Sequence, residues 1–369
     1  MTVQQLQRTP FHDMHVQCGA KMVPFAGFEM PVQYSTGITK EHETVRTAVG
    51  VFDVSHMGEF EFSGPDRNAW VNRLTCNDVG ALEEGQAQYT ALLTDDGTFI
   101  DDCIVYRFDD RLMLVVNAAN LEKDWDHVVA SKGSINARVK NISDEVALLA
   151  VQGPESEALL QSLTQANLAD LGYFRFEIGH LGGVDCFIAR TGYTGEDGFE
   201  LYFRPAHAEV MWHAVVGQGR AIPCGLGARD SLRLEVGYAL YGSDIDETIN
   251  PYEARLGWIV KLQKGVPFRG RDALQAIKAK GPTRQLVGFQ CHGRMIPRPG
   301  YDVYLNDHKV DVVRSGGFGP SLGVGIGTTY LPTHSVAPGT MIEIEYRGRR
   351  VEAEVVNMPF YTKGSVKKP

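Results

Sequence analysis

Two adjacent aspartates, Asp101 and Asp102, interrupt the apolar run FIDDCIVY. Successive side chains of a β-strand point to opposite faces, so Asp101 would share a face with Phe99, and Asp102 with Ile100. Burying a charge without a partner is costly, so an acid on an apolar face is paired, protonated or retained for function. The pair is therefore a candidate for carboxylate catalysis, although acids near strand ends also bond to backbone turns.

The segment TGYTGEDGFE, residues 191–200, is a second candidate because its three glycines are spaced three residues apart. Glycine permits positive φ and lets a ligand come close to the backbone. Glu200 begins a strand and could point toward either face. The alternative interpretation is a decorated hairpin loop.

A third candidate is GLGARDSLRLE, residues 225–235, in which a glycine-containing loop runs into a helix. Asp230 suits the start of a helix, whereas a cation such as Arg229 opposes the helix macrodipole there. Arg229 therefore needs another partner, such as the Glu200 carboxylate or an anionic ligand. The alternative is a solvated arginine.

Several common catalytic signatures are missing from the sequence. Its eleven histidines form no H-E-x-x-H or His-Cys ligand spacing, and no G-x-G-x-x-G or Walker pattern occurs. The G-x-S-x-G match GPSLG, residues 319–323, lies in a glycine-dense stretch without the strand-to-helix context of a nucleophile elbow. His56, in DVSHMGE, is expected to pack or bond locally. The sequence thus predicts no metal site, no flavin or nicotinamide site, and no serine hydrolase.

Composition narrows the class of protein further. The 369 residues are 43% hydrophobic and 22% charged, as in ordinary globular proteins of two or three domains. A net charge of -9 repels polyphosphate backbones, so no nucleic-acid partner is expected. Six scattered cysteines and the lack of a long apolar stretch predict a soluble, cytoplasmic protein without membrane contact. A eukaryotic matrix enzyme that has lost its transit peptide would look the same.

Hydrophobic periodicity indicates alternating helices and short strands before Pro282, and only short strands after it. The helix at 121–130 is expected to turn Trp125, Val128 and Val129 inward. The other predicted helices lie at 36–48, from 66 to about 77, from 154 and from 225. The predicted strands lie at 51–62, 89–93, 99–108, 112–117, 146–151, 186–189 and 199–203.

Eight segments occur in one order along the chain: RTPFHDMHVQCGAKMVPFAGFEMPVQY, VGVFDVSHMGEF, GTFIDDCIVY, VVNAAN, VQGP, RTGYTGEDGFE, PCGLGARDSLRLE and MPFY. Together they closely resemble the aminomethyltransferases, or T-proteins, of the glycine cleavage system. The resemblance implies an α+β, three-domain cloverleaf with mainly antiparallel sheets around a central folate cavity. It implies a split first domain (1–50 plus 145–280), an inserted α+β domain (51–144) and an all-β, barrel or jelly-roll-like C-terminal domain (281–369).

The resemblance also implies the chemistry. The aminomethyl group on the lipoyl arm of H-protein would pass to tetrahydrofolate, giving methylenetetrahydrofolate, ammonia and dihydrolipoyl H-protein. By its position in the matching motif, Asp102 would be the catalytic acid and Asp101 a neighbour with a structural role. The reaction that the resemblance implies requires no metal. The residues expected to line the folate are Glu200, Arg229, Tyr193, Tyr89, Tyr106, Asn117 and Tyr173.

Three points stay open at this level. The C-terminal residues Tyr361 and Lys363 are possible folate contacts. Carrier docking is expected to use a basic cluster, either RGRR near Arg349 or the terminal lysines Lys363, Lys367 and Lys368, unless both are merely solvated. The alternative functions are another folate-dependent enzyme, such as a demethylase, and a folate-binding maintenance protein without catalytic activity.

Overall fold

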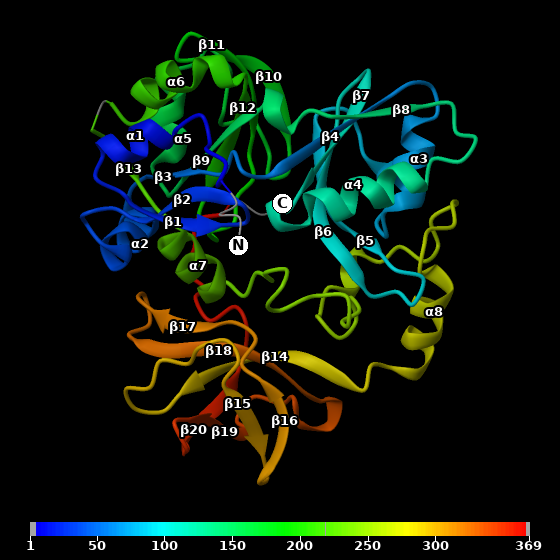
Figure 1. Cartoon of the computed structure of the whole chain (residues 1–369), viewed down its shortest axis with the longest axis vertical. Coiled ribbons are helices and arrows are strands. Elements are labelled where there is room, and N and C mark those ends of the chain that lie inside the picture. Colours follow the sequence, from blue (N-terminus) through cyan, green and yellow to red (C-terminus); the bar gives the residue numbers. More distant parts are fainter. Residues whose placement is uncertain (1–4, 218, 367–369) are drawn as a thin grey trace.

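The computed structural model describes residues 5–217 and 219–366, which form three lobes, each built on a large β-sheet (Figure 1). The sheets have six, five and seven strands, and a two-stranded hairpin stands apart from them. Among the named strands in the described part of the chain, only β13 and β3 pair in parallel. The expected α+β fold with mainly antiparallel sheets is confirmed.

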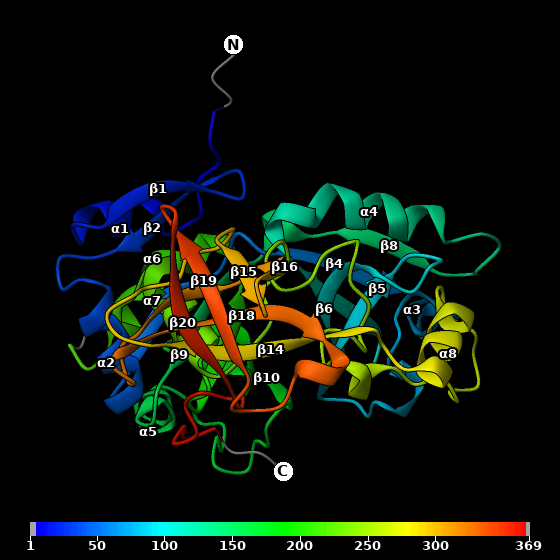
Figure 2. The same ribbon diagram turned by 90° about the horizontal axis from the view of Figure 1, so that it is seen from below.

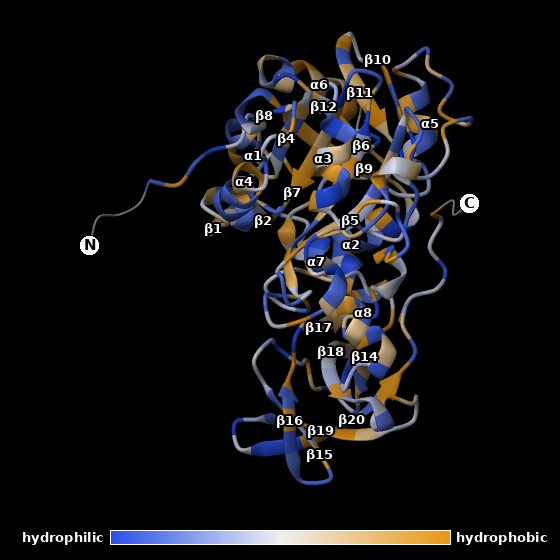
Figure 3. Ribbon diagram, turned by 90° about the vertical axis from the view of Figure 1, so that its right-hand side faces the viewer, coloured by the Kyte–Doolittle hydropathy of each residue, from blue (hydrophilic) through white to orange (hydrophobic). Residues whose placement is uncertain are grey.

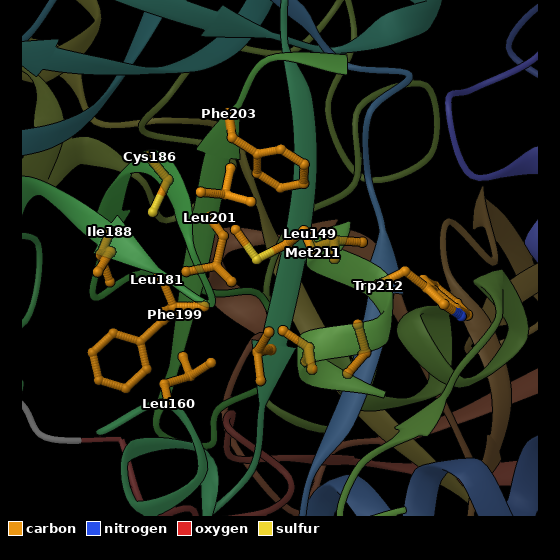
Figure 4. Close-up of a cluster of buried hydrophobic side chains, with 14 of the residues drawn as sticks. Leu149, Leu160, Leu181, Cys186, Ile188, Phe199, Leu201, Phe203, Met211 and Trp212 are labelled. Atoms are coloured by element: carbon orange, nitrogen blue, oxygen red, sulfur yellow. The ribbon is translucent and has the colours of Figure 1, made fainter. Parts of the chain in front are cut away.

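The six-stranded sheet has the order β10-β11-β12-β9-β3-β13 and packs against helices. Its apolar core includes Leu149, Phe199 and Met211, all fully buried, and Figure 4 shows these side chains converging between the strands and α6. Its strands are β3 (Gly50–Asp53), β9 (Ala147–Gln152), β10 (Phe176–Leu181), β11 (Val184–Ala189), β12 (Gly198–Phe203) and β13 (Ile222–Pro223). The same lobe contains α1 (His12–Gln17), the hairpin β1 (Lys21–Phe25) and β2 (Phe28–Gln33), α2 (Ile38–Thr47), α5 (Ser156–Gln161), α6 (Ala208–Val215) and α7 (Leu226–Glu235).

The five-stranded sheet has the order β5-β6-β7-β4-β8 and contains the expected meander. Its strands are β4 (Gly58–Ser63), β5 (Gln86–Leu93), β6 (Phe99–Arg107), β7 (Arg111–Val116) and β8 (Arg138–Asn141). Helices α3 (Arg67–Leu74) and α4 (Leu121–Ala130) cover one face, where Phe60, Trp70 and Val128 are buried together. The opposite face is turned toward the six-stranded sheet, and Tyr106 and Tyr202 share a second core between them.

The seven-stranded sheet has the order β16-β15-β19-β20-β14-β18-β17 and follows α8 (Arg271–Lys280). Its strands are β14 (Arg284–Cys291), β15 (Asp302–Leu305), β16 (His308–Val312), β17 (Gly316–Gly319), β18 (Val324–Pro332), β19 (Met341–Tyr346) and β20 (Arg349–Val356). Asp311 of β16 accepts the backbone N–H of Tyr330 in β18 at 2.9 Å, although these strands are far apart in the order. The sheet is therefore curled into a half-barrel, which confirms the all-β C-terminal region.

Three local predictions differ from the structure. The expected strand at 51–62 is two strands in different sheets, β3 and β4, because the chain turns between them with the Met57 N–H bonded to Val54 O. The helix expected at 36–48 begins at Ile38 with Gly37 as its N-cap, and no side chain caps it. Val129 is 46% exposed rather than inward, since α4 turns Asp124 and Val128 toward the sheet.

The segment between α7 and β14 packs mainly on the five-stranded sheet. Ile245, Ile259 and Leu274 share a core with Leu93 and Phe99 of β5 and β6. Lys264 extends the same contact, because its buried ammonium group donates to backbone carbonyls such as Asn77 O at 2.7 Å. This segment therefore joins the second lobe to the third.

The N-terminal and C-terminal segments of the described residues lie on opposite sides of the molecule in Figure 2. The C-terminal strand β20 leads into a segment that leaves the half-barrel and returns to the first lobe, where Tyr361 N donates to Glu235 O at 2.8 Å. Figure 3 shows hydrophobic residues concentrated along the strands and hydrophilic residues along the extended N-terminal segment. The hydrophobic effect thus stabilises the sheets, and polar contacts attach the C-terminal segment.

Candidate functional site

A β-bulge determines where the two aspartates point. Leu92 of β5 pairs with Asp101 and Leu93 pairs with Phe99, so Ile100 is the extra residue on β6. A bulge changes the alternation of side chains along its strand. Ile100 therefore packs in the core beneath α3 and α4, and the prediction that it shares a face with Asp102 is wrong.

Asp102 is half-buried on the face of β6 turned toward the first lobe and is held by two donors. The Tyr89 hydroxyl donates to Oδ2 at 2.8 Å, and Asn117 Nδ2 donates to Oδ1 at 2.9 Å. Burial, followed by the neighbouring charge of Asp101, raises the pKa of Asp102 to about 7 against the opposing effect of the two hydrogen bonds. Such a carboxyl group can both accept and donate a proton near neutral pH.

Asp101 points the other way and is completely buried. It accepts the Asn117 backbone N–H at 3.0 Å, Asn117 Nδ2 at 2.8 Å and Asn120 Nδ2 at 2.6 Å. Asn117 thereby joins both carboxylates and fixes their separation. Asp101 is thus well supplied with donors, whereas Asp102 faces the space between the lobes.

Glu200 of β12 has one occupied and one unoccupied carboxylate oxygen. Oε2 accepts the hydroxyls of Thr191 at 2.6 Å, Tyr106 at 3.3 Å and Tyr202 at 3.4 Å. Among the described residues, no donor reaches Oε1. The side chain is only 8% exposed, so the free oxygen is an acceptor in a sheltered position.

The guanidinium of Arg229, on α7, has no hydrogen-bond or ion-pair partner within residues 5–217 and 219–366. Its guanidinium lies 4.9 Å from the centre of the Tyr193 ring. Burial lowers the pKa of Arg229, and the charge of Glu200 opposes this without a direct bond. The expected Glu200 partner is therefore nearby but not bonded, and the cation is free to meet an anionic or polar ligand.

Tyr193 connects these groups. Burial raises the pKa of the Tyr193 hydroxyl. The charge of Asp102 raises this pKa further and the charge of Arg229 lowers it, so both charged groups lie close to the Tyr193 ring. The hydroxyl donates to Ala239 O, and the ring stacks on Tyr238 with centroids 5.7 Å apart. The hydroxyl of Tyr173 faces the same Tyr238, which, after burial, raises the pKa of Tyr173. The aspartate, the arginine and three tyrosines from separate segments therefore border a common space.

Sequence reasoning missed two aromatic residues of this cluster. Trp258 is 60% exposed and stacks on Tyr89 with centroids 6.0 Å apart, beside the Asp102 carboxylate. Tyr238 follows α7 and joins Tyr173 to Tyr193. Neither lies in a chemical motif, and only the return of the 236–283 segment to the second lobe brings Trp258 to the site.

The described part of the C-terminal segment makes its contacts at another place. The Tyr361 ring lies under Arg46, 4.2 Å from its guanidinium carbon, and Ser365 Oγ donates to Glu196 Oε2 at 2.6 Å. Lys363 is exposed, and Lys367 and Lys368 lie outside the described residues. The segment instead braces the loop that carries Tyr193.

His56 packs locally, as expected. It is buried with its ring edge-on to Phe25 at 5.5 Å, and burial lowers its pKa to about 4. In the described part of the chain, no three His, Cys, Asp or Glu side chains are grouped to hold a metal ion. No helix among these residues is long and apolar enough to cross a bilayer.

Two cavities lie away from the cluster. One of about 340 Å³ is lined by Trp70, His127 and Arg269, and one of about 440 Å³ by Asp170 and Arg175. Neither is bordered by Asp102 or Glu200. The candidate catalytic and binding side chains therefore lie between the lobes and outside both cavities.

Comparison with known proteins identifies the family of the chain. Residues 11–264 match the family described as the GCVT N-terminal domain, and residues 284–362 match the glycine cleavage T-protein C-terminal barrel domain. The chain belongs to the glycine cleavage T-protein family. Two curated relatives named aminomethyltransferase are similar over the whole length. The protein of Chloroherpeton thalassium is 48% identical over 364 residues, which is 97% of this chain and 99% of the relative. That of Phocaeicola vulgatus is 46% identical over 361 residues, which is 96% of this chain and 99% of the relative.

A solved T-protein structure supports the same assignment. The glycine cleavage system aminomethyltransferase T from Bartonella henselae superposes with a TM-score of 0.93 at 33% identity, covering 98% of this chain and all of that one. Residues 265–283, which include α8, lie between the two matched ranges. The T-protein resemblance inferred from the motifs is confirmed, and the chain is a folate-dependent transferase of this family.

Proposed function

We propose that the protein transfers the aminomethyl carbon from the lipoyl arm of H-protein to tetrahydrofolate, the acceptor substrate. The observation that carries this proposal is the open acceptor at Glu200 Oε1 and the unpartnered Arg229 beside an aspartate of pKa about 7. A pterin offers N–H donors and ring acceptors, which suit a carboxylate and a guanidinium respectively. The amphoteric Asp102 carboxyl then suits the reactive nitrogens.

The lining residues divide into three roles. Glu200 accepts ring N–H groups of the folate, and its orientation is maintained by Tyr106 through the hydroxyl network. Arg229 lies over Tyr193, which supports the guanidinium from below. Tyr89 and Asn117 hold the Asp102 carboxylate, and Tyr173 supports Tyr193 through Tyr238.

The reaction needs two proton transfers and no redox partner. The S–CH₂ and CH₂–NH₂ bonds of the aminomethyl thioether break, and the carbon forms bonds to two folate nitrogens. The protons displaced from these nitrogens end on the sulfur and on the departing ammonia. An ionised Asp102 stabilises positive charge developing at nitrogen and can accept one proton, and its protonated form can return it to the leaving group.

The deciding experiment is a transfer assay with aminomethylated H-protein and tetrahydrofolate, followed as released ammonia and methylenetetrahydrofolate. Turnover that requires both components supports the proposal. A demethylase would instead use N-methylated amines without H-protein, and a maintenance protein would bind folate without product. Turnover in the absence of both H-protein and tetrahydrofolate, or with only the N-methylated amine, would overturn the assignment.

We also propose the domain division and the setting of the reaction. The split domain (1–50 plus 145–280), the insert (51–144) and the C-terminal domain (281–369) fit the three sheets, except that β3 starts at Gly50 and the 245–274 segment packs on the insert. Five of the six free cysteines are buried and reduced thiols suit the cytoplasm, or the matrix for a processed eukaryotic chain. H-protein is the proposed partner, and no metal or flavin is part of the proposal.

A further inference from the structure

Helix α4 turns a carboxyl group into an apolar core. Asp124 is completely buried, whereas Val129 on the same helix is 46% exposed. Within the described residues, neither Asp124 Oδ1 nor Oδ2 receives a hydrogen bond from a donor. The adjacent Lys123 does not neutralise it, because its ammonium group donates to Tyr241 at 2.7 Å and Glu247 at 3.0 Å. An ionised carboxylate in this position would be a buried charge without compensation.

The group that faces Asp124 is another carboxyl group, that of Asp101, close enough for the two to share a hydrogen bond. Two carboxylates are both acceptors, so such a bond forms only when one of them carries a proton. Asp101 receives three N–H donors from Asn117 and Asn120, which stabilise a negative charge. Asp124 receives none and so holds the proton. Burial, followed by the charge of Asp101, raises the pKa of Asp124 to about 10, in agreement with this assignment.

We propose that Asp124 is a positioning residue, a neutral carboxylic acid that donates a hydrogen bond to Asp101 and keeps one shared negative charge behind Asp102. The proposal rests on the proposed catalytic role of Asp102. After burial, the charge of Asp101 also raises the pKa of Asp102, and a hydrogen bond disperses that charge. Asp124 therefore acts on the reaction through Asp101, without touching substrate.

Few other groups can produce the same effect. The titratable and charged groups that face Asp124 are Asp101, Asp102 and Cys103 of β6, together with Lys123 of its own helix. Cys103 remains a neutral thiol because burial raises its pKa well above the usual value. Among these groups, the Asp101–Asp124 pair is thus the one whose charge can change and so alter the pKa of Asp102.

Two substitutions separate the donor from the charge. Asp124→Asn keeps a neutral donor of nearly the same shape, so the acid limb of the kcat–pH profile should stay within about 0.2 pH units of wild type. Asp124→Leu removes the donor, which concentrates the charge of Asp101 and should move that limb upward by about 0.5 pH units or more. KM for tetrahydrofolate should change little in both variants. If Asp124 were ionised, both substitutions would remove a negative charge and move the limb downward together, which would overturn the proposal.

A second measurement is independent of catalysis and of the fold of the leucine variant. The infrared difference spectrum of wild type minus Asp124→Asn, taken at about pH 8, should contain the carbonyl stretch of a protonated carboxyl group. Lack of this band would refute the neutral state of Asp124 even if Asp102 is catalytic. If the band is present and Asp102→Asn retains full turnover, the role of Asp102 fails while the protonation of Asp124 stands.

Discussion

Replacement of Asp102 by asparagine should make the protein more stable at alkaline pH and nearly inactive. An asparagine can keep both hydrogen bonds, because its Oδ1 can accept from Asn117 Nδ2 and its Nδ2 can donate to the Tyr89 oxygen. The substitution therefore removes the charge while preserving the contacts. What changes is the dependence of folding on pH.

The sign follows from the raised pKa of Asp102. The pKa of an aspartate is ordinarily 3.8, and that of Asp102 is about 7 in the folded protein. The unfolded chain ionises first, so the free energy of unfolding is unaffected below the unfolded pKa and falls as pH rises from there to about 7. Integration between about pH 5 and pH 8 gives a loss of about 2–3 kcal/mol, which the asparagine variant avoids.

The assay is urea unfolding of wild type and Asp102→Asn at both pH values, followed by circular dichroism. The difference in unfolding free energy should grow by about 2–3 kcal/mol toward pH 8. Asp96→Asn removes an exposed carboxylate from the neighbouring turn and serves as the matched control, with no such growth. Turnover of Asp102→Asn should fall by about a hundredfold, the scale for removing one preorganised electrostatic group. A pH-independent stability difference, or wild-type turnover, would refute the reasoning.

Four further outcomes are expected. Glu200→Gln should weaken tetrahydrofolate binding by about 1.5–3 kcal/mol in a calorimetric titration, the range for a hydrogen bond to a charged group, and an unchanged titration would remove Glu200 from the binding surface. Arg229→Met should weaken folate binding without lowering the free energy of unfolding, because the guanidinium has no ion-pair partner among the described residues, and a large loss of stability would reveal one. Gly364→Ala should lower the urea midpoint, since the new Cβ would lie 2.1 Å from the carbonyl oxygen of Gly195, whereas Gly265→Ala meets nothing within 4 Å and should not; equal midpoints would contradict this. Turnover should survive exhaustive chelation with EDTA, and a stoichiometric metal required for activity would reveal a site that the motifs do not indicate.

Local pattern was sufficient for much of the architecture. Alternation and turn residues predicted the meander β5–β6–β7, and the loss of helical periodicity after Pro282 predicted the all-β half-barrel. These features depend on residues close in sequence, where hydrophobic periodicity and turn chemistry act directly. The ordered motifs also identified the family, and they drew attention to Asp102, Glu200 and Arg229 before any geometry was known.

Tertiary structure decided what those residues can do. The bulge at Ile100 resets the alternation of β6, and no periodicity in a single strand reveals a register set by pairing with β5. One of the three donors to Glu200 Oε2, Tyr106, comes from another lobe. The protonation of Asp124 likewise depends on Asp101, which lies 23 residues earlier in the chain. Sequence determines which chemical groups the protein possesses, whereas burial and long-range neighbours determine their charge, because desolvation and Coulomb energy depend on distance in space.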